Sequence, residues 1–195
     1  KKFPDITVKA IDEMGDAFQL NVLKQAVDNN KKVVLFWYPK DFTFVCPSEI
    51  IAFDKRFNEF KSRGVEVIGV SVDSKYSHLA WKNTEVNKGG IGQVKYPLVS
   101  DLTKSIARDY DVLMGDAVAL RGTFLIDQEG MVRHQLINDL PLGRNIEEAI
   151  RMIDALKFFQ EHGEVCPAGW NQGKKGMKAS TQGVAEYLSL NVEDL

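Results

Sequence analysis

The chain has few of the features that mark several common classes of protein. Its 195 residues include only two cysteines, and 25 Lys and Arg residues are nearly balanced by 27 Asp and Glu residues. This near-neutral charge gives no electrostatic reason to expect nucleic acid or a membrane surface as a partner. No apolar run approaches the roughly 20 residues that a membrane-spanning helix needs. We therefore expect a protein with neither kind of partner.

The low cysteine count also excludes a class of fold. Two cysteines are too few for the disulfide framework of a small secreted domain, so we interpret them as a reactive pair in an intracellular, cytoplasmic protein. The printed sequence starts at Lys1 with neither an initiator methionine nor a signal-like apolar region, which we interpret as a processed or trimmed start.

The two cysteines share a tripeptide but differ in their surroundings. Val45-Cys46-Pro47 follows an apolar run and opens an amphipathic segment, whereas Val165-Cys166-Pro167 lies in a loop rich in proline and glycine. A thiol where a strand passes into a helix is placed for ionisation, and a thiol in a flexible polar loop is placed to move. This contrast predicts an attacking and a resolving cysteine, and hence redox chemistry.

The apolar pattern predicts an α/β fold around Cys46. Residues 33–38 form a continuous apolar, β-favouring run, as expected of a strand covered on both faces. After Cys46, apolar residues at steps of three and four predict one amphipathic helix that stops near Gly64, and residues 65–72 read as a second buried strand. Further predicted elements are helices at Leu20–Asn30, 76–87, 145–162 and 183–190, and a β-hairpin of 122–127 with 131–137.

The composition changes at Glu164, where Pro, Gly and Lys residues replace the apolar pattern. We predict one domain over residues 1–163 and a C-terminal arm over residues 164–195 that carries Cys166. Since the arm has little core of its own, we expect it to pack either on another subunit or on the body of its own chain.

Local chemistry favours a thiolate at Cys46 but limits what ionisation can achieve. Pro47 suits the first position of a helix, which would make Cys46 the N-cap, near the positive end of the helix dipole. An anion there gains roughly 0.3–1 kcal/mol, up to about 2. A larger effect needs a cation, and Arg121, at the mouth of the predicted hairpin, is the candidate.

Lowering the pKa of a thiol also increases its rate of attack only slightly. A drop from about 8.5 to about 6 raises the thiolate fraction at neutral pH roughly thirtyfold. The accompanying loss of nucleophilicity, with a Brønsted slope of about 0.4–0.5, is roughly tenfold. A fast enzyme must therefore stabilise the transition state with donors aimed at the developing charge. Thr43, three residues before Cys46, and Arg121 are the candidate donors.

Residues 39–46, PKDFTFVC, match the Pro-x3-Thr-x2-Cys signature of the peroxiredoxins. Four more stretches resemble the typical 2-Cys group of that family, in order along nearly the whole chain: Val70–Trp81, Arg121–Asp127, Asp139–Arg144 and Val165–Trp170. Within the family, the sequence looks most like the bacterial alkyl hydroperoxide reductase C type. The resemblance implies a thioredoxin-like fold, with a central mixed sheet flanked by helices, and a thiol-dependent peroxidase in which Cys46 is peroxidatic.

The resemblance also implies roles for the residues around the peroxidatic thiol. Pro39 would shield it, while Thr43 and Arg121 would bind the peroxide. Glu49 and Arg144 would belong to the surrounding polar network. From the sequence alone, Glu49 also suits the first turn of a helix, where an acid interacts favourably with the dipole. Because its charge would oppose a thiolate, a functional role for it must depend on hydrogen bonding.

The implied cycle involves a second subunit and a reductant. Cys166 would be the resolving cysteine, contributed by the other subunit of an antiparallel homodimer, with five dimers assembled into a decamer. A peroxide would oxidise Cys46 to a sulfenic acid, and Cys166 would condense with it to a disulfide. A dithiol partner would then reduce this bond, either thioredoxin or an NADH-dependent flavoprotein disulfide reductase. The resemblance implies no cofactor and no metal, and a role in antioxidant defence.

Other classes of function fit the residues less well. A Cys-His hydrolase would need His78, His134 or His162 beside Cys46, and none of the three lies in a recognisable motif. The two cysteines lack the spacing of a zinc site. A thioredoxin-type oxidoreductase requires Cys-x-x-Cys, and position 49 is Glu49. A holdase chaperone role of the oligomer is compatible with peroxidase activity as a second function.

Overall fold

The computed structural model describes residues 5, 7–12 and 14–194, and the chain divides into two compact units, Lys1–Ile146 and Glu147–Leu195. The predicted arm, residues 164–195, lies within the second unit. Among the residues described, no helix is both long and apolar enough to cross a membrane.

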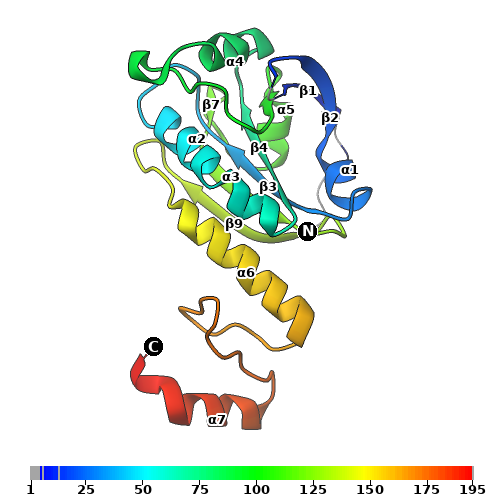
Figure 1. Ribbon diagram of the computed structural model, residues 1–195, viewed down its shortest axis with the longest axis vertical. Helices are drawn as coiled ribbons and strands as arrows, with labels where there is room; N and C mark the ends of the chain where they lie inside the picture. Colours follow the sequence, from blue (N-terminus) through cyan, green and yellow to red (C-terminus); the bar gives the residue numbers. More distant parts are fainter. Residues whose placement is uncertain (1–4, 6, 13, 195) are drawn as a thin grey trace. The chain divides into compact units, whose positions relative to one another are not determined.

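All of the strands found among the described residues lie in the first unit (Figure 1). Its elements are β1 (Thr7–Ile11), β2 (Ala17–Asn21), α1 (Val22–Val27), β3 (Lys32–Trp37), α2 (Cys46–Lys55), α3 (Phe57–Ser62), β4 (Val65–Ser71), α4 (Lys75–Lys82), η1 (Val86–Lys88), β5 (Leu98–Ser100), α5 (Ser105–Asp109), β6 (Leu113–Met114), β7 (Val118–Ala119), β8 (Arg121–Ile126) and β9 (Val132–Asn138).

Seven of these strands form one mixed sheet, in the order β2-β1-β5-β4-β3-β8-β9. The pairs β3–β4 and β4–β5 are parallel, whereas β3–β8, β8–β9, β1–β5 and β1–β2 are antiparallel. The parallel pairing of β3 with β4 across α2 and α3 confirms the predicted β-α-β unit, and the antiparallel pair β8–β9 confirms the predicted hairpin. The central strand β3 leads directly into the segment before Cys46.

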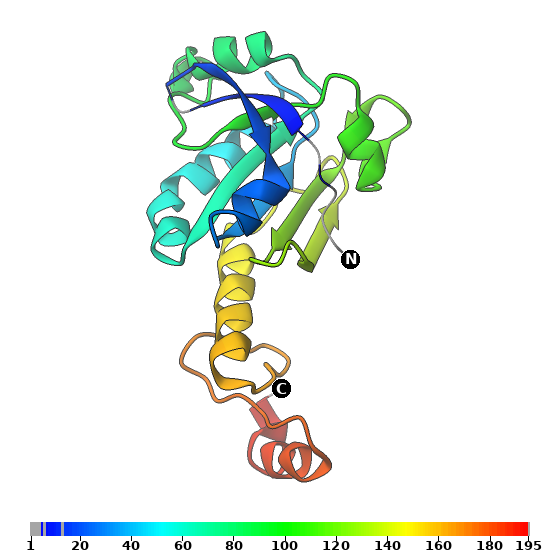
Figure 2. The same cartoon turned by 90° about the vertical axis from the view of Figure 1, so that its right-hand side faces the viewer.

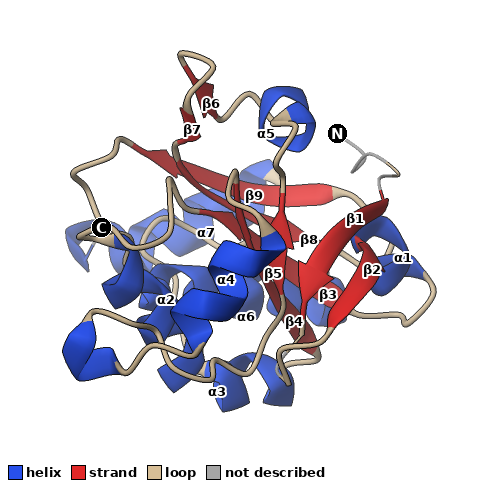
Figure 3. Cartoon of the chain, turned by 90° about the horizontal axis from the view of Figure 1, so that it is seen from above, coloured by secondary structure: helices blue, strands red, loops and turns tan. Residues whose placement is uncertain are grey.

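The central strand is buried on both faces because its side chains alternate between two cores. Val33, Leu35 and Trp37 belong to an apolar cluster that includes residues of α1 and α5. On the opposite face, the ring of Phe36 stacks on that of Phe53 in α2, with centroids 4.2 Å apart. Figure 3 shows helices on both sides of the sheet, with α2, α3 and α4 on one side and α1 and α5 on the other. The predicted central sheet with flanking helices is confirmed.

Some predicted boundaries are wrong. The single helix expected from Cys46 to Gly64 is two helices, because Arg56 takes φ −94° and ψ 5° and interrupts the ladder between α2 and α3. Both helices keep an apolar side toward the sheet, so the spacing of the aromatic residues does not reveal the break. The helix predicted for residues 76–87 ends at Lys82, and a 3₁₀ turn follows at Val86–Lys88. The helix predicted for Leu20–Asn30 is only Val22–Val27, since Leu20 belongs to β2.

The second unit comprises most of α6 (Ile146–His162), a long loop, α7 (Thr181–Asn191) and the 3₁₀ turn η2 (Val192–Asp194) (Figure 2). The predicted helix over residues 145–162 is thus confirmed, and Gly163 follows it with φ +69°, a conformation that suits glycine after a helix. Within the loop, Val165 and Met177 form an isolated antiparallel bridge. Cys166 is the residue after this bridge.

Candidate active site

Cys46 is the first residue of α2, and Val45 is the N-cap. The prediction that Cys46 itself caps the helix is therefore wrong by one residue, because Val45 already has αR dihedral angles (φ −83°, ψ −36°). Cys46 is fully buried and Pro47 lies in the first turn, where its missing N–H removes no helical hydrogen bond. The sulfur still lies at the N-terminal end of α2, where the dipole favours an anion.

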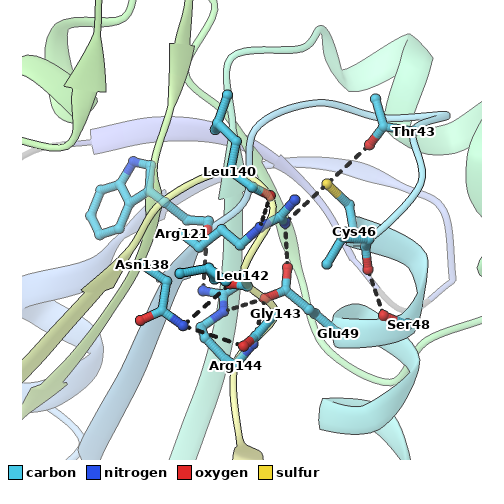
Figure 4. Close-up of polar contacts among 12 residues, drawn as sticks. Thr43, Cys46, Ser48, Glu49, Arg121, Asn138, Leu140, Leu142, Gly143 and Arg144 are labelled. Atoms are coloured by element: carbon cyan, nitrogen blue, oxygen red, sulfur yellow. Dashed lines mark hydrogen bonds and ion pairs between the residues drawn. The ribbon is translucent and has the colours of Figure 1, made fainter.

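Two side chains lie within hydrogen-bonding distance of the Cys46 sulfur (Figure 4). Thr43 Oγ1 is 3.0 Å from Sγ, and Arg121 Nη1 is 3.4 Å from it. Thr43 is three residues away along the same loop. Arg121 is 75 residues away and is brought near by sheet pairing, because Thr123 of β8 lies opposite Phe36 of β3. The structure therefore brings together the two donors that were predicted for Cys46.

The Thr43 hydroxyl also lies 2.7 Å from the carbonyl oxygen of Lys40. A hydroxyl has one proton to donate. When Cys46 is a thiol, its S–H can donate to Thr43 while Thr43 donates to the Lys40 carbonyl. When Cys46 is a thiolate, the Thr43 proton can turn to the sulfur instead. This arrangement lets one side chain serve both protonation states without moving its heavy atoms.

Glu49 holds the two arginines of the site (Figure 4). Its Oε2 accepts a bond of 2.6 Å from Arg121 Nη1, and its Oε1 accepts bonds from the backbone N and Nε of Arg144 at 3.0 and 2.9 Å. The three side chains are each at most 4% exposed. One buried carboxylate between two guanidinium groups leaves a net charge of +1 beside Cys46. The expected opposition of Glu49 to a thiolate is thus outweighed, and its contacts are the hydrogen bonds that the sequence argument required.

Arg144 connects this cluster to the sheet. Its Nη1 donates to the carbonyl oxygens of Trp37 and Gly122, each at 2.8 Å, and its guanidinium lies over the ring of Phe36, 5.0 Å from the centroid. Burial lowers the pKa of Arg144, and the charge of Glu49 opposes this shift. Because a guanidinium loses its proton only far above neutral pH, Arg144 remains a cation at neutral pH.

A short loop after β9 completes the frame around Arg121. The Leu140 carbonyl accepts a bond of 2.7 Å from Arg121 Nε, and Asn138 Nδ2 donates to the carbonyls of Leu142 and Gly143 at 3.2 and 3.3 Å (Figure 4). The orientation of the Arg121 guanidinium is therefore set by a carbonyl on one side and a carboxylate on the other. A donor held in this way loses little reorganisation energy when charge develops beside it.

A second polar network, which the sequence argument missed, anchors the loop before Cys46. Asp41 accepts bonds from the Tyr38 hydroxyl at 2.9 Å, lies 2.8 Å from His78 Nδ1, and donates its backbone N–H to Asp73 at 2.8 Å. Burial raises the pKa of Tyr38, with the nearby Asp41 acting in the same direction, so the phenol stays neutral. Two stretches of the sequence could have pointed to this network, since Asp41 lies inside the PKDFTFVC motif and His78 inside the stretch 70–81.

This network also bears on the Cys-His hydrolase alternative. The ring nitrogens of His78 contact Asp41 and, at 3.1 Å, the Val99 carbonyl, whereas the hydrogen-bonding side chains found at Cys46 are Thr43 and Arg121. His78 is thus a buried anchor of the loop in this structure. Pro39, the predicted shield, is buried two residues after the end of β3, at the start of the same loop.

Cys166 lies in the second unit and has a different environment. Its sulfur is partly buried, and the thiol donates to the Ala155 carbonyl of α6 at 3.4 Å. Burial raises the pKa of Cys166, and the nearby Arg151 guanidinium opposes this rise. Both cysteines are free thiols. In the part of the chain that the structure describes, no cluster of three or more His, Cys, Asp or Glu side chains could hold a metal ion.

Two family models match the chain. Residues 1–135 match the AhpC/TSA family, and residues 155–190 match the C-terminal domain of 1-Cys peroxiredoxin. A protein of Helicobacter pylori named alkyl hydroperoxide reductase C is 60% identical over 194 residues, which cover 98% of this chain and 96% of that protein. Peroxiredoxin-2 of Mus musculus is 47% identical over 97% of this chain and 94% of its own length.

Comparison with solved structures agrees with the sequence relatives. The reduced 2-Cys peroxiredoxin of Plasmodium vivax superposes with a TM-score of 0.94 at 50% identity, and the alignment covers 97% of each chain. A structure titled as AhpC of Enterococcus faecalis superposes with a TM-score of 0.78 at 34% identity, covering 86% of this chain and 97% of that one. The predicted thioredoxin-like fold is confirmed.

Proposed function

The chain belongs to the AhpC/TSA family of thiol-dependent peroxidases, the peroxiredoxins, and from this premise we propose that Cys46 is the thiol that reduces the peroxide. The observation that carries this assignment is the pair of donors, Thr43 Oγ1 and Arg121 Nη1, 3.0 and 3.4 Å from its sulfur. Cys46 is also the thiol at the positive end of a helix, beside a buried cluster with a net charge of +1.

In the first step, the Cys46 thiolate attacks one oxygen of the peroxide. The S–O bond forms as the O–O bond breaks, the sulfur is oxidised to a sulfenic acid, and the second oxygen leaves as an alkoxide or hydroxide. That oxygen takes up the proton released by the thiol and departs as an alcohol or water. Negative charge moves from sulfur to the leaving oxygen, so donors that reach both atoms lower the barrier.

Thr43 and Arg121 supply such donors from two segments that are far apart in the sequence. We assign Thr43 to hydrogen bonding of the bound peroxide and Arg121 to stabilisation of the charge on the oxygens. Glu49 and Arg144 are assigned as positioning residues, because they hold Arg121 and the start of α2 through the bonds described above. Pro39 is assigned as the shield of the thiol, in keeping with its burial at the start of the loop.

In the second step, Cys166 from the other protomer of a dimer condenses with the sulfenic acid. A disulfide requires the two Cα atoms to lie within about 7 Å of one another. Cys46 is fully buried, so its turn of α2 must open before a second sulfur can reach it. The backbone of the first turn is held at one carbonyl: Ser48 Oγ, Ser48 N and Glu49 N donate to the Val45 carbonyl at 2.6, 3.1 and 3.4 Å, and Val45 has no side-chain cap.

The third step needs a reductant that accepts the oxidising equivalents of the disulfide. We propose a dithiol protein in the cytoplasm, either thioredoxin or an NADH-dependent flavoprotein disulfide reductase. A homodimer that assembles further into a decamer is the proposed oligomer. One neighbour, a Plasmodium yoelii Prx1a modified at the N-terminus, forms an octamer described as artifactual, so assembly beyond a dimer is possible for a chain of this fold. The holdase role stays a prediction.

Rapid mixing with hydrogen peroxide tests the roles of the two cysteines. We expect Cys46→Ser to abolish the fast reaction. Cys166→Ser should consume one equivalent of peroxide per subunit at the wild-type rate and then stop, because the sulfenic acid has no thiol partner. Rapid peroxide consumption that survives Cys46→Ser would overturn the assignment. Sustained turnover by Cys166→Ser with thioredoxin and its reductase would overturn the resolving role.

The same proteins, supplied with each reductant in turn, identify the partner. We expect the wild type to turn over continuously with the physiological dithiol and to stall with the other one. Equal absence of turnover with both would contradict the proposal of a dithiol reductant from either class. Sedimentation velocity of the reduced protein tests the decamer, which a particle no larger than a dimer at micromolar concentration would contradict.

A further inference from the structure

The loop that carries Cys166 folds back along α6 within the second unit, as Figures 1 and 2 both show. Two hydrogen bonds tie the loop to the helix: Cys166 Sγ donates to the Ala155 carbonyl at 3.4 Å, and Arg151 Nη1 donates to the Trp170 carbonyl at 2.8 Å. Trp170 is 3% exposed, and its ring lies 5.0 Å from that of Phe158. Contacts with α6 therefore hold the segment from Cys166 to Trp170, and Arg151 supplies one of the two hydrogen bonds.

Arg151 is itself held in one orientation. Its Nε and Nη2 donate to the two carboxylate oxygens of Glu148 at 2.6 and 2.7 Å, a bidentate pair one turn apart on α6. The side chains of Arg151 and Glu148 are 28% and 35% exposed. A bidentate fork fixes the plane of a guanidinium, which a lysine ammonium cannot imitate. The remaining nitrogen, Nη1, is thereby directed at the Trp170 carbonyl.

The surroundings of Cys166 otherwise favour the neutral thiol. Its S–H donates to a carbonyl oxygen, a bond that a thiolate cannot make, and burial raises the pKa of Cys166. Along the chain, three acids, Glu148, Asp154 and Glu164, belong to α6 or to the loop that carries Cys166. Arg151 is the cation that acts on the thiol in the opposite direction. Without Arg151, this positive charge would no longer oppose the rise in the pKa of Cys166 that burial causes.

We propose that Arg151 is a positioning residue of the resolving step, which fixes the Cys166–Trp170 loop on α6 and presents a positive charge to the attacking sulfur. This inference rests on the proposed role of Cys166 as the resolving cysteine. In that step the Cys166 thiolate attacks the sulfur of the Cys46 sulfenic acid. The S–S bond forms, the S–O bond breaks, and the departing hydroxide leaves as water with the proton that Cys166 released. The sulfenic sulfur is reduced and the Cys166 sulfur is oxidised.

The size of the charge effect follows from thiol chemistry. If the loss of the guanidinium raises the thiol pKa by about one unit, the thiolate fraction at neutral pH falls about tenfold. The more basic thiolate is about threefold more nucleophilic, given a Brønsted slope of about 0.4–0.5. The net result is a roughly threefold slower attack. Loss of the bond to Trp170 loosens the loop and slows the step further, so we expect Arg151→Gln to form the disulfide at least about threefold more slowly.

The first measurement isolates the thiol. In a Cys46→Ser background, the rate of Cys166 alkylation by iodoacetamide is followed against pH for wild-type Arg151, Arg151→Gln, Arg151→Lys and Lys157→Gln. Lys157 is a matched control, since it lies on the same helix in an exposed pair with Glu161. We expect the alkylation midpoint to rise by about one pH unit in Arg151→Gln and to stay near the wild-type value in the other two.

The second measurement uses the protein with both cysteines intact. Stopped-flow fluorescence separates sulfenic acid formation from disulfide formation. We expect Arg151→Gln to leave the first rate unchanged, to slow the second, and to increase the fraction of Cys46 oxidised to sulfinic acid at high peroxide. Arg151→Lys keeps the charge but loses the fork, so it should slow disulfide formation without shifting the alkylation midpoint.

The outcomes separate this inference from the proposed function. If Cys166→Ser sustains turnover with thioredoxin and its reductase, the resolving role of Cys166 fails, and the inference fails with it. If Cys166→Ser stalls after the first oxidation but Arg151→Gln forms the disulfide at the wild-type rate, only the inference fails. If Arg151→Gln does not fold, Arg151→Lys decides: a wild-type rate of disulfide formation would overturn the positioning role.

Discussion

The two cysteines occupy environments of opposite character. Cys46 is fully buried at the start of α2, with two donors near its sulfur and a buried cluster of net charge +1 behind them. Cys166 is only partly buried in a loop, where its thiol is itself the donor, to the Ala155 carbonyl. The first environment offers hydrogen bonds to an anion, and the second accepts a hydrogen bond from a neutral thiol.

This difference accounts for the order of the two proposed reactions. A thiol that receives hydrogen bonds as an anion is suited to attack a peroxide first. A thiol that donates a hydrogen bond stays protonated, so it does not compete for the peroxide and is preserved for the sulfenic acid. The two sites also differ in how they are held, because Arg121 lies in the sheet and is fixed by Glu49 and Leu140, whereas the Cys166 loop depends on a few bonds to one helix. Four experiments test this comparison.

The largest expected effect is on the stability of the protein, through the buried cluster of Glu49, Arg121 and Arg144 beside Cys46. Glu49→Gln removes the carboxylate that lies between Arg121 and Arg144 and leaves two buried cations without a counter-charge. We expect a loss of about 3–5 kcal/mol in the free energy of unfolding. Urea denaturation at one fixed protein concentration measures this, since subunit association also contributes to the apparent stability.

The matched control is Glu59→Gln, whose carboxylate forms an exposed pair with Arg56 and for which we expect a loss of about 0–1 kcal/mol. Equal losses in the two variants would show that burial of the Glu49 cluster has no energetic consequence, and the comparison would then lose its physical basis.

The second expected effect is on the first oxidation. Arg121→Gln removes the positive charge beside Cys46, and we expect the rate constant with hydrogen peroxide to fall about 10²–10³-fold. Competition for peroxide with a reference peroxidase measures this rate constant. Arg108→Gln, which alters an exposed pair with Asp116, should keep the wild-type value. A fall of less than tenfold in Arg121→Gln would mean that charge at this position is not used in the transition state.

A smaller effect is expected at the hydroxyl. Thr43→Val keeps the shape of the side chain but removes the donor 3.0 Å from the Cys46 sulfur, and the same rate constant should fall about 10²-fold. Thr43→Ser should recover most of the loss. Thr7→Val, at an exposed position of β1, serves as the control and should have no effect. If Thr43→Ser were as slow as Thr43→Val, the methyl group rather than the hydroxyl would be the important part.

The smallest effect is the pH dependence of disulfide formation. Burial raises the pKa of Cys166 above its ordinary value, so the thiol is mostly protonated at neutral pH. The thiolate fraction, and with it the rate of disulfide formation, should rise with pH by up to about tenfold per unit. Stopped-flow traces of the second phase between about pH 6.5 and 8.5 measure this slope. A flat profile would show that Cys166 is already ionised and that the two environments do not differ in this respect.

Much of the first unit could be predicted because its signals are local. Residues 33–38 are apolar throughout, and the resulting strand is buried on both faces. The turn residues Gln128-Glu129-Gly130 marked the hairpin of β8 with β9, and Thr43 lies three residues from Cys46, within one turn of the chain. In each case the residues that carry the signal are close in sequence, so their pattern is sufficient to reveal the element.

Other elements leave no such pattern. Strands β1, β2, β5, β6 and β7 went unpredicted. Strand β5 has only three residues and pairs with β1 and β4, which are far away along the chain, and β2 lies at the edge of the sheet. The helix break at Arg56 also left the spacing of apolar residues unchanged. The Tyr38–Asp41–His78–Asp73 network was missed because Asp41 meets Asp73 and, in α4, His78 only through the fold, 32 and 37 residues away, by polar side chains that also suit a solvated surface.

The sequence by itself determined which atoms we propose to react. Val-Cys-Pro after an apolar strand, with a threonine three residues earlier, predicts Cys46 as the attacking thiol, because these groups lie within a few residues of one another. Only the tertiary structure decided what surrounds that thiol. Arg121 reaches Cys46 because β8 pairs with β3, and Glu49 bears on the thiol through two arginines rather than by opposing it. Likewise, Arg151 meets the Cys166 loop because that loop folds back on α6. Charges far apart in sequence interact strongly only when folding brings them together and removes the water between them.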